Sequence, residues 1–206
     1  MSRWLLVSVA LLAGLLIVQN AHAAGKHHGK CSAPGSHTVF QDSRTRVFTR
    51  TSADDPDVQR TVACRLADGR RFKLAEDGGG ESHIDRVSNL SAVGRWLGYA
   101  VTQEERARVD TGSACALNLR TGKRRCGGNH PMIGVGVSRA GSLAWMTYES
   151  LDEGELACCQ VYELGAGAEK AVLLDQGPDI EKDSFAVGGH RIYWTKAGAA
   201  KSATMP

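Results

Sequence analysis

Self-similarity at a period of nearly fifty residues constrains this chain more than any other feature of its sequence. Four segments align, and they read RTRVFTRT, GRWLGYAV, GSLAWMTY and HRIYWTKA. The apolar positions that superpose are Val47, Leu97, Leu143 and Ile192, which are spaced by 50, 46 and 49 residues. The positions two residues later are Thr49, Tyr99, Trp145 and Trp194. Because alternate side chains share one face of a strand, each segment is predicted to be a strand.

Further strands are predicted on both sides of each of these segments. A second alternating stretch follows the first three, and Asp68-Gly69 and Thr121-Gly122 are typical hairpin turns within it. We call the aligned positions Val47, Leu97, Leu143 and Ile192 the markers. A short apolar stretch comes before each marker, and these stretches read HTVF, VSNLSAV, IGVGV and SFAV. Each unit therefore has about four strands, and no long amphipathic helix is expected. The predicted fold class is all-β, with about four propeller-like blades of antiparallel strands.

The best-matching stretches resemble a known repeat family. Residues 95–99 (RWLGY) and 117–124 (LNLRTGKR) are similar to the WD40-like repeat of TolB-type bacterial propellers, and residues 138–145 (SRAGSLAW) resemble the Ser-Pro-Asp-Gly turn of that family without its Pro and Asp. The resemblance covers residues 37–204 and implies protein contacts at the cell envelope. The chain has room for four blades at most, so we expect a small closed ring, an open partial propeller, or half of a dimeric ring.

The first 23 residues are predicted to be a secretory signal peptide. Arg3 precedes an apolar run of 15 residues from Trp4 to Val18, and Ala21-His22-Ala23 is a typical cleavage signal. The run is shorter than the roughly 20 residues that span a bilayer, so no membrane span is expected after cleavage. We expect residues 24–36 to be a flexible segment that leads into the repeat domain at residues 37–204, and we expect a secreted or otherwise extracytoplasmic protein.

All six cysteines follow the predicted leader, and an even number in an exported chain favours disulfides. Cys115 and Cys126 flank the Thr121-Gly122 turn almost symmetrically and are the predicted cross-strand pair. Six cysteines allow 15 connectivities, so the other pairs stay open. Zinc binding by the cysteines is the alternative interpretation. However, no CxxC motif is present, and Cys158 and Cys159 would point to opposite faces if they lay in a strand.

The connections between the second and third strands of the first three units are acidic. Their carboxylates belong to Asp54, Asp55, Asp57, Glu104, Glu105, Asp110, Asp152, Glu153 and Glu155. Since the loops would emerge at one edge of successive blades, they form a candidate rim for a basic partner or for Ca²⁺, which prefers carboxylate oxygens. The alternative interpretation is a set of charged loops that keep the protein soluble. No cofactor is otherwise expected.

Two other motifs suggest chemistry that the chain does not otherwise support. Asp110-Thr111-Gly112-Ser113 matches the catalytic tetrapeptide of pepsin-like and retroviral proteases, but that chemistry needs two facing loops, and the equivalent connections lack the motif. We interpret it as a solvated turn. Gly25-Lys26-His27 would bind Cu²⁺ only if cleavage left Gly25 at the amino terminus. No Gly-x-Ser-x-Gly motif is present.

These observations predict an exported, non-catalytic binding or scaffolding module with an unidentified ligand. Without Arg3 the chain has 24 basic and 22 acidic residues, which is too balanced to favour nucleic acid. We expect a protein or glycan partner at the cell envelope, and a homodimer remains an alternative. The competing hypothesis is an extracellular hydrolase or lyase that uses the loop carboxylates.

Overall fold

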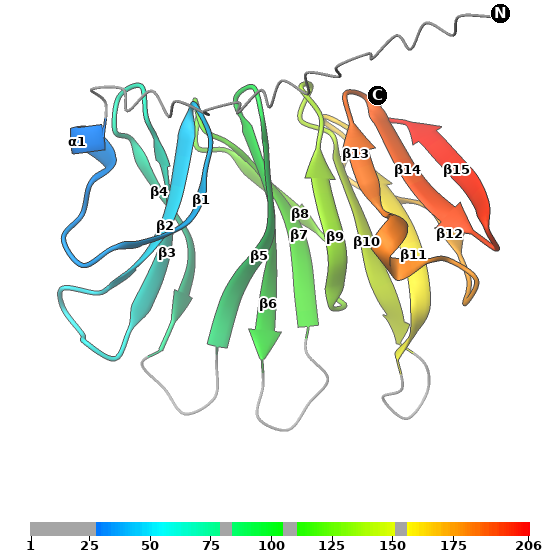
Figure 1. The fold of residues 1–206 in the computed structure, drawn as a ribbon, viewed down its shortest axis with the longest axis horizontal. Coiled ribbons are helices and arrows are strands. Elements are labelled where there is room, and N and C mark those ends of the chain that lie inside the picture. Colours follow the sequence, from blue (N-terminus) through cyan, green and yellow to red (C-terminus); the bar gives the residue numbers. More distant parts are fainter. Residues whose placement is uncertain (1–27, 79–83, 105–110, 151–155) are drawn as a thin grey trace, which may run out of the picture.

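The computed structural model describes residues 28–78, 84–104, 111–150 and 156–206, which form four antiparallel sheets and a short helix. The sheets lie side by side in chain order, with the first at the left of Figure 1 and the last at the right. The predicted leader and residues 24–27 lie outside the described residues. Within the described part of the chain, no helix is long and apolar enough to cross a membrane.

The first two sheets each contain four strands in simple up-and-down order. The first consists of β1 (His37–Gln41), β2 (Thr45–Thr51), β3 (Gln59–Arg65) and β4 (Arg71–Asp77). The second consists of β5 (Ile84–Val93), β6 (Trp96–Glu104), β7 (Thr111–Asn118) and β8 (Arg124–Gly127). Each strand pairs with the next one in sequence, as short turns between apolar alternations predict.

The third sheet repeats this order and the fourth contains one strand fewer. The third consists of β9 (Met132–Val137), β10 (Leu143–Ser150), β11 (Leu156–Leu164) and β12 (Val172–Gln176). The fourth consists of β13 (Ala186–Gly188), β14 (Arg191–Lys196) and β15 (Ala199–Thr204). The SFAV stretch was expected to be a strand throughout, but Ser184 belongs to a 3-10 helix, η2 (Lys182–Ser184), and the strand begins only at Ala186.

The hydrophobic core is divided into layers between successive sheets. Leu97 and Tyr99 pack with Val47 and Ala63 between the first and second sheets. Trp145 packs in the layer between the second and third sheets, and Ile192 and Trp194 pack between the third and fourth. Each sheet is thus stabilised mainly by apolar side chains that it buries against its neighbours in the row.

Two glycines permit this close packing. Gly136 on β9 faces Val187 of the last sheet, and a Cβ atom there would come within 2.3 Å of the Val187 side chain. Gly141 has a φ of 95°, and its Cβ would come within 2.3 Å of the Trp96 ring. Any larger residue would therefore push neighbouring sheets apart.

Arginines at the outer hairpins also join neighbouring sheets. Arg70 donates from Nη1 to the carbonyl of Arg120 at 2.8 Å, which links the first sheet to the second. Arg125 donates from Nη2 to the carbonyl of Gly165 at 2.6 Å, which links the second sheet to the third. The first bond engages a carbonyl group of a hairpin turn. The second is added to the hydrogen bond that the Gly165 carbonyl already accepts from the Ala168 N–H at 2.9 Å.

Three disulfides join the six cysteines. The structure connects Cys115 to Cys126, the pair that the hairpin spacing predicts, across directly paired positions of β7 and β8. It also joins Cys31 to Cys64. The neighbours Cys158 and Cys159 form the third bond, so the expectation that they point to opposite faces was wrong. That expectation assumed a trans peptide, whereas the bond between them is cis.

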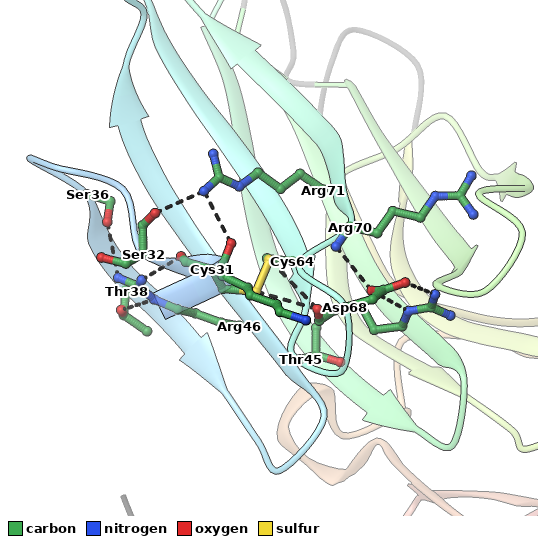
Figure 2. The surroundings of a disulfide bond; sticks show 12 residues. Cys31, Ser32, Ser36, Thr38, Thr45, Arg46, Cys64, Asp68, Arg70 and Arg71 are labelled. Atoms are coloured by element: carbon green, nitrogen blue, oxygen red, sulfur yellow. Dashed lines mark hydrogen bonds and ion pairs between the residues drawn. A yellow bond between two sulfur atoms is a disulfide. The ribbon is translucent and has the colours of Figure 1, made fainter. Parts of the chain in front are cut away.

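The segment before β1 lies against the outer face of the first sheet. The helix α1 (His28–Cys31) ends at the disulfide to Cys64 on β3, and Cys31 is buried with Phe48 and Val62. Figure 2 shows this region, where Arg46 reaches from β2 to the carbonyl of Cys31 at 2.9 Å. We call residues 28–36 the strap.

Candidate functional site

Two hollows in the described part of the chain lie at the turns that join the first two strands of each sheet. These turns, at residues 42–44, 94–95, 138–142 and 189–190, lie along the upper edge of the sheets in Figure 1. They come from four different sheets, so any surface they form depends on how the sheets pack. Of the acidic loops predicted as a site, the first connects β2 to β3 at residues 52–58, whereas residues 105–110 and 151–155 of the other two lie outside the described residues.

The first of these turns is fixed by a side chain of its own. The Oδ1 atom of Asp42 accepts the backbone N–H of Arg44 at 2.8 Å and that of Thr45 at 2.6 Å. An Asp that binds the backbone two and three residues ahead is the usual way to hold such a turn. The Arg44 side chain is exposed, and within the described residues it forms no ion pair.

The third turn is held in the same way by a serine. Ser142 donates its backbone N–H to the Ser138 hydroxyl at 3.1 Å, and Gly141 donates to the Ser138 carbonyl at 3.0 Å. Arg139 and Ala140 form the exposed tip, and the Arg139 side chain also forms no ion pair within the described residues. The segment that resembles the Ser-Pro-Asp-Gly turn thus has its glycine packed against Trp96 and its arginine in solvent.

Two adjoining hollows open between these turns. The first, of about 520 Å³, is lined by residues 42–44, 92–94 and 139. The second, of about 400 Å³, is lined by residues 93, 138–140, 189–190 and 205–206. Val93 and Arg139 line both, so the two hollows adjoin at these residues, and we call them together the end groove. The volumes are in the range of small-ligand or peptide side-chain sites.

The two halves of the end groove differ in chemistry. Arg44 and Arg139 line the first half, where Asp42 has the only carboxylate among the described residues of the lining. The second half is lined largely by apolar groups, among them Val93, Ala140 and Met205, with Arg139 and His190 as its basic members. An excess of positive charge therefore lies beside an apolar hollow, an arrangement that can hold an acidic group next to an apolar one.

A third hollow continues from Val93 between the first strands of the last three sheets. It has a volume of about 370 Å³ and is lined by residues 89–91, 133–137 and 185–187 together with Val93. Ser91 lines it, and its buried hydroxyl has no hydrogen-bond partner within the described residues. The lining is otherwise mostly apolar and contains no charged residue among those described.

The predicted acidic rim is described only in its first loop. Asp55 there accepts the backbone N–H of Asp57 at 2.9 Å, and Asp54 lies 3.9 Å from Arg60. Glu104 ends β6, and nothing is described of its side chain. The remaining residues of the rim, Glu105, Asp110, Asp152, Glu153 and Glu155, lie outside the described residues. Among the residues that are described, no group of three or more His, Cys, Asp or Glu side chains could hold a metal ion.

The aspartic-protease tetrapeptide is partly described. Asp110 lies outside the described residues, whereas Thr111, Gly112 and Ser113 begin strand β7. Gly112 packs against the chain at His130, where a Cβ would come within 2.7 Å of a carbonyl oxygen. These three residues are therefore placed by strand pairing with β6, not by a turn.

Several pKa shifts occur in the layers between the sheets. Burial raises the pKa of Tyr99 to about 12, although the nearby Arg124 acts in the opposite direction. Burial also raises the pKa of Glu163 on β11. For Asp175 burial acts to raise the pKa, but hydrogen bonds from Lys196, Trp194 and the backbone of Gln176 together lower it. None of these groups lines the end groove, so we assign them to packing.

Sequence reasoning directed attention to the acidic edge and missed the end groove. Arg44, Arg139 and His190 were not predicted as site residues, because a single basic residue in a turn carries no signal on its own. The signal was available in the alignment, since all three fall within four residues before the marker positions Val47, Leu143 and Ile192.

No protein-family model, curated protein or solved structure matches the chain.

Proposed function

We propose that this protein is an exported, non-catalytic binding or scaffolding module of the cell envelope or extracellular space. In this proposal the end groove is the binding surface, and the four sheets are blades of an open, propeller-like repeat of the WD40-like, TolB type. The marker positions support the repeat, because Val47, Leu97, Leu143 and Ile192 all lie in second strands and are all 0% exposed.

One observation carries the binding proposal. The end groove is lined by turns from all four sheets, and its two halves share Val93 and Arg139. Ligand sites on repeat and propeller folds are built from equivalent loops of successive units, because these loops can vary without disturbing the core. A groove built from four such loops is what a binding module of this architecture requires.

The disulfides support the proposed location. Three cysteine pairs are joined in the structure, and structural disulfides persist in oxidising compartments outside the cytoplasm. The predicted leader at residues 1–23 is consistent with that location. A module exported in this way would meet its partner in the envelope or beyond it.

Site-specific photo-crosslinking tests the proposal. A benzoylphenylalanine residue at Ser43, which is exposed and lines the end groove, should give a discrete adduct in the extracytoplasmic fraction of the producing organism. The matched control is the same residue at Val172, which is 59% exposed on the edge strand β12 and lines neither half of the groove. Adducts at both positions to the same extent, or at neither, would contradict a binding surface at the groove.

A further inference from the structure

We infer that the end groove binds an acidic peptide segment in which a carboxylate side chain neighbours an apolar one. The inference rests on the proposed binding function and names the chemistry of its ligand. Arg44 and Arg139 come from different sheets and flank the same half of the groove. Two arginines that line one hollow suit a carboxylate, because the forked donors of a guanidinium group match its two oxygens.

The charge of the lining favours an anion over a cation. Among the described side chains of the two hollows, Asp42 has the only carboxylate, and its Oδ1 atom is already engaged by the backbone N–H groups of Arg44 and Thr45. Neither arginine forms an ion pair within the described residues. The described side chains of the lining thus carry more positive than negative charge, which favours an anion.

The second half of the groove defines the rest of the ligand. Val93, Ala140 and Met205 offer an apolar surface directly next to Arg139. An aliphatic side chain beside the carboxylate would bury its surface there, which adds about 25 cal/mol for each Å² removed from water. An acidic polysaccharide would satisfy the arginines but leave this surface unfilled, because its sugars carry hydroxyl groups. A peptide with adjoining Glu and Leu side chains fits both halves.

Fluorescence anisotropy with a defined probe tests the inference. The probe is a fluorescein-labelled decapeptide that contains two Glu-Leu pairs, and the reference is the same peptide with Gln in place of each Glu. We expect saturable binding of the Glu peptide by the mature protein and about tenfold weaker binding of the Gln peptide, which corresponds to about 1.4 kcal/mol. Binding should also weaken as salt is raised, because the groove is open to solvent.

Three variants separate the groove from general charge. Arg44→Gln and Arg139→Gln should each weaken binding of the Glu peptide by about tenfold, whereas Arg120→Gln should leave it unchanged. Arg120 is an exposed arginine in the β7–β8 turn and lines neither half of the groove. Because all three side chains are exposed, we expect the variants to fold, and circular dichroism with a thermal melt checks this.

Three results would overturn the inference: no binding of the Glu peptide, equal binding of the two peptides, or equal losses in all three variants. A preference for polygalacturonate over the Glu peptide would also overturn it, in favour of an acidic glycan. In each case an adduct at position 43 would leave the binding function standing. Absence of that adduct, in contrast, contradicts the binding function whatever the peptide does.

Discussion

The outer faces of the first and last sheets occupy opposite ends of the row, and they are protected in different ways. Phe48 and Tyr193 follow the marker residues Val47 and Ile192 directly, so they hold the same place in the alignment. Phe48 is 0% exposed beneath the strap, whereas Tyr193 is 42% exposed. The first sheet is sealed by a covalently attached segment, and the last sheet faces solvent with small and polar neighbours.

The difference shows how a row of sheets can end. Each inner sheet is covered on both faces by its neighbours, but each terminal sheet has one face that the repeat leaves uncovered. At the first sheet, a disulfide and two arginines hold the strap over Phe48, since Arg46 and Arg71 lie 4.9 and 6.0 Å from its ring centre. At the last sheet the outer face has fewer apolar side chains and a shorter sheet, which reduces the surface to be protected.

The largest expected effect comes from truncating the two aligned aromatic residues. Phe48→Ala should lower the free energy of unfolding by about 4 kcal/mol, because it removes a fully buried ring and leaves a cavity. Tyr193→Ala should cost less than about 1 kcal/mol, because its ring is already largely solvated. Urea unfolding followed by tryptophan fluorescence measures both values. Similar losses in the two variants would mean that the two outer faces contribute equally and that the comparison is wrong.

Removal of the Cys31–Cys64 disulfide should have the next largest effect. The double variant Cys31→Ala, Cys64→Ala should lose about 3.5 kcal/mol, because the bond closes a loop with a sequence separation of 33. The matched control is Cys115→Ala, Cys126→Ala, whose separation is 11 and whose loss should be about 1 kcal/mol smaller. Limited proteolysis should cleave the strap faster only in the first variant, and unchanged cleavage there would show that the strap does not depend on the disulfide.

An ion pair adds to the apolar packing between the third and last sheets and gives a smaller, pH-dependent effect. Asp175 on β12 accepts hydrogen bonds from Lys196 Nζ at 2.7 Å and Trp194 Nε1 at 2.9 Å, both on β14. These bonds lower the pKa of Asp175 against the effect of burial, so its stabilising contribution is complete above the usual Asp pKa and is lost as pH falls through the lowered value.

Asp175→Asn should therefore cost about 1.5 kcal/mol at neutral pH and progressively less below about pH 4. Urea unfolding of both proteins from pH 7 to pH 3 measures the difference. If the difference in free energy of unfolding between the two proteins stays constant over this range, the carboxylate does not contribute through its charge. Asp54→Asn is the matched control, because Asp54 is exposed and its weak contact with Arg60 should give almost no difference at any pH.

The sequence was informative wherever the constraint was local. Alternation and turn dipeptides located most strands, and the symmetric spacing around Thr121-Gly122 identified the Cys115–Cys126 pair. The disulfide that holds the strap could not be predicted, because nothing in the spacing of Cys31 and Cys64 distinguishes that pair among the many connectivities that six cysteines allow. The third pair was missed for a different reason, since strand alternation assumes a trans peptide between Cys158 and Cys159.

The end groove could not be predicted because it depends on how the sheets pack. Arg44 and Arg139 are 95 residues apart in sequence, and only the packing of the sheets brings them to one hollow. The carboxylates drew attention to the predicted acidic loops because several fall within each loop, whereas the basic residues in the described lining of the groove are Arg44, Arg139 and His190, one from each of three turns. The density of charge along the chain is thus a poor guide to a surface that takes single basic residues from separate units.

The smallest effect tests the arginines that precede the two markers. The Arg46 side chain donates to Thr38 Oγ1 at 2.8 Å and to the Cys31 carbonyl at 2.9 Å. Arg191 holds the same place in the last sheet, but its side chain is exposed and forms no hydrogen bond or ion pair within the described residues. Arg46→Met keeps an apolar side chain but removes the guanidinium group, so we expect the free energy of unfolding to fall by about 1 kcal/mol. Arg191→Met should be neutral within about 0.5 kcal/mol. Both values follow from urea unfolding, and a loss in Arg191→Met that equals the loss in Arg46→Met would show that the last sheet has a cover of its own.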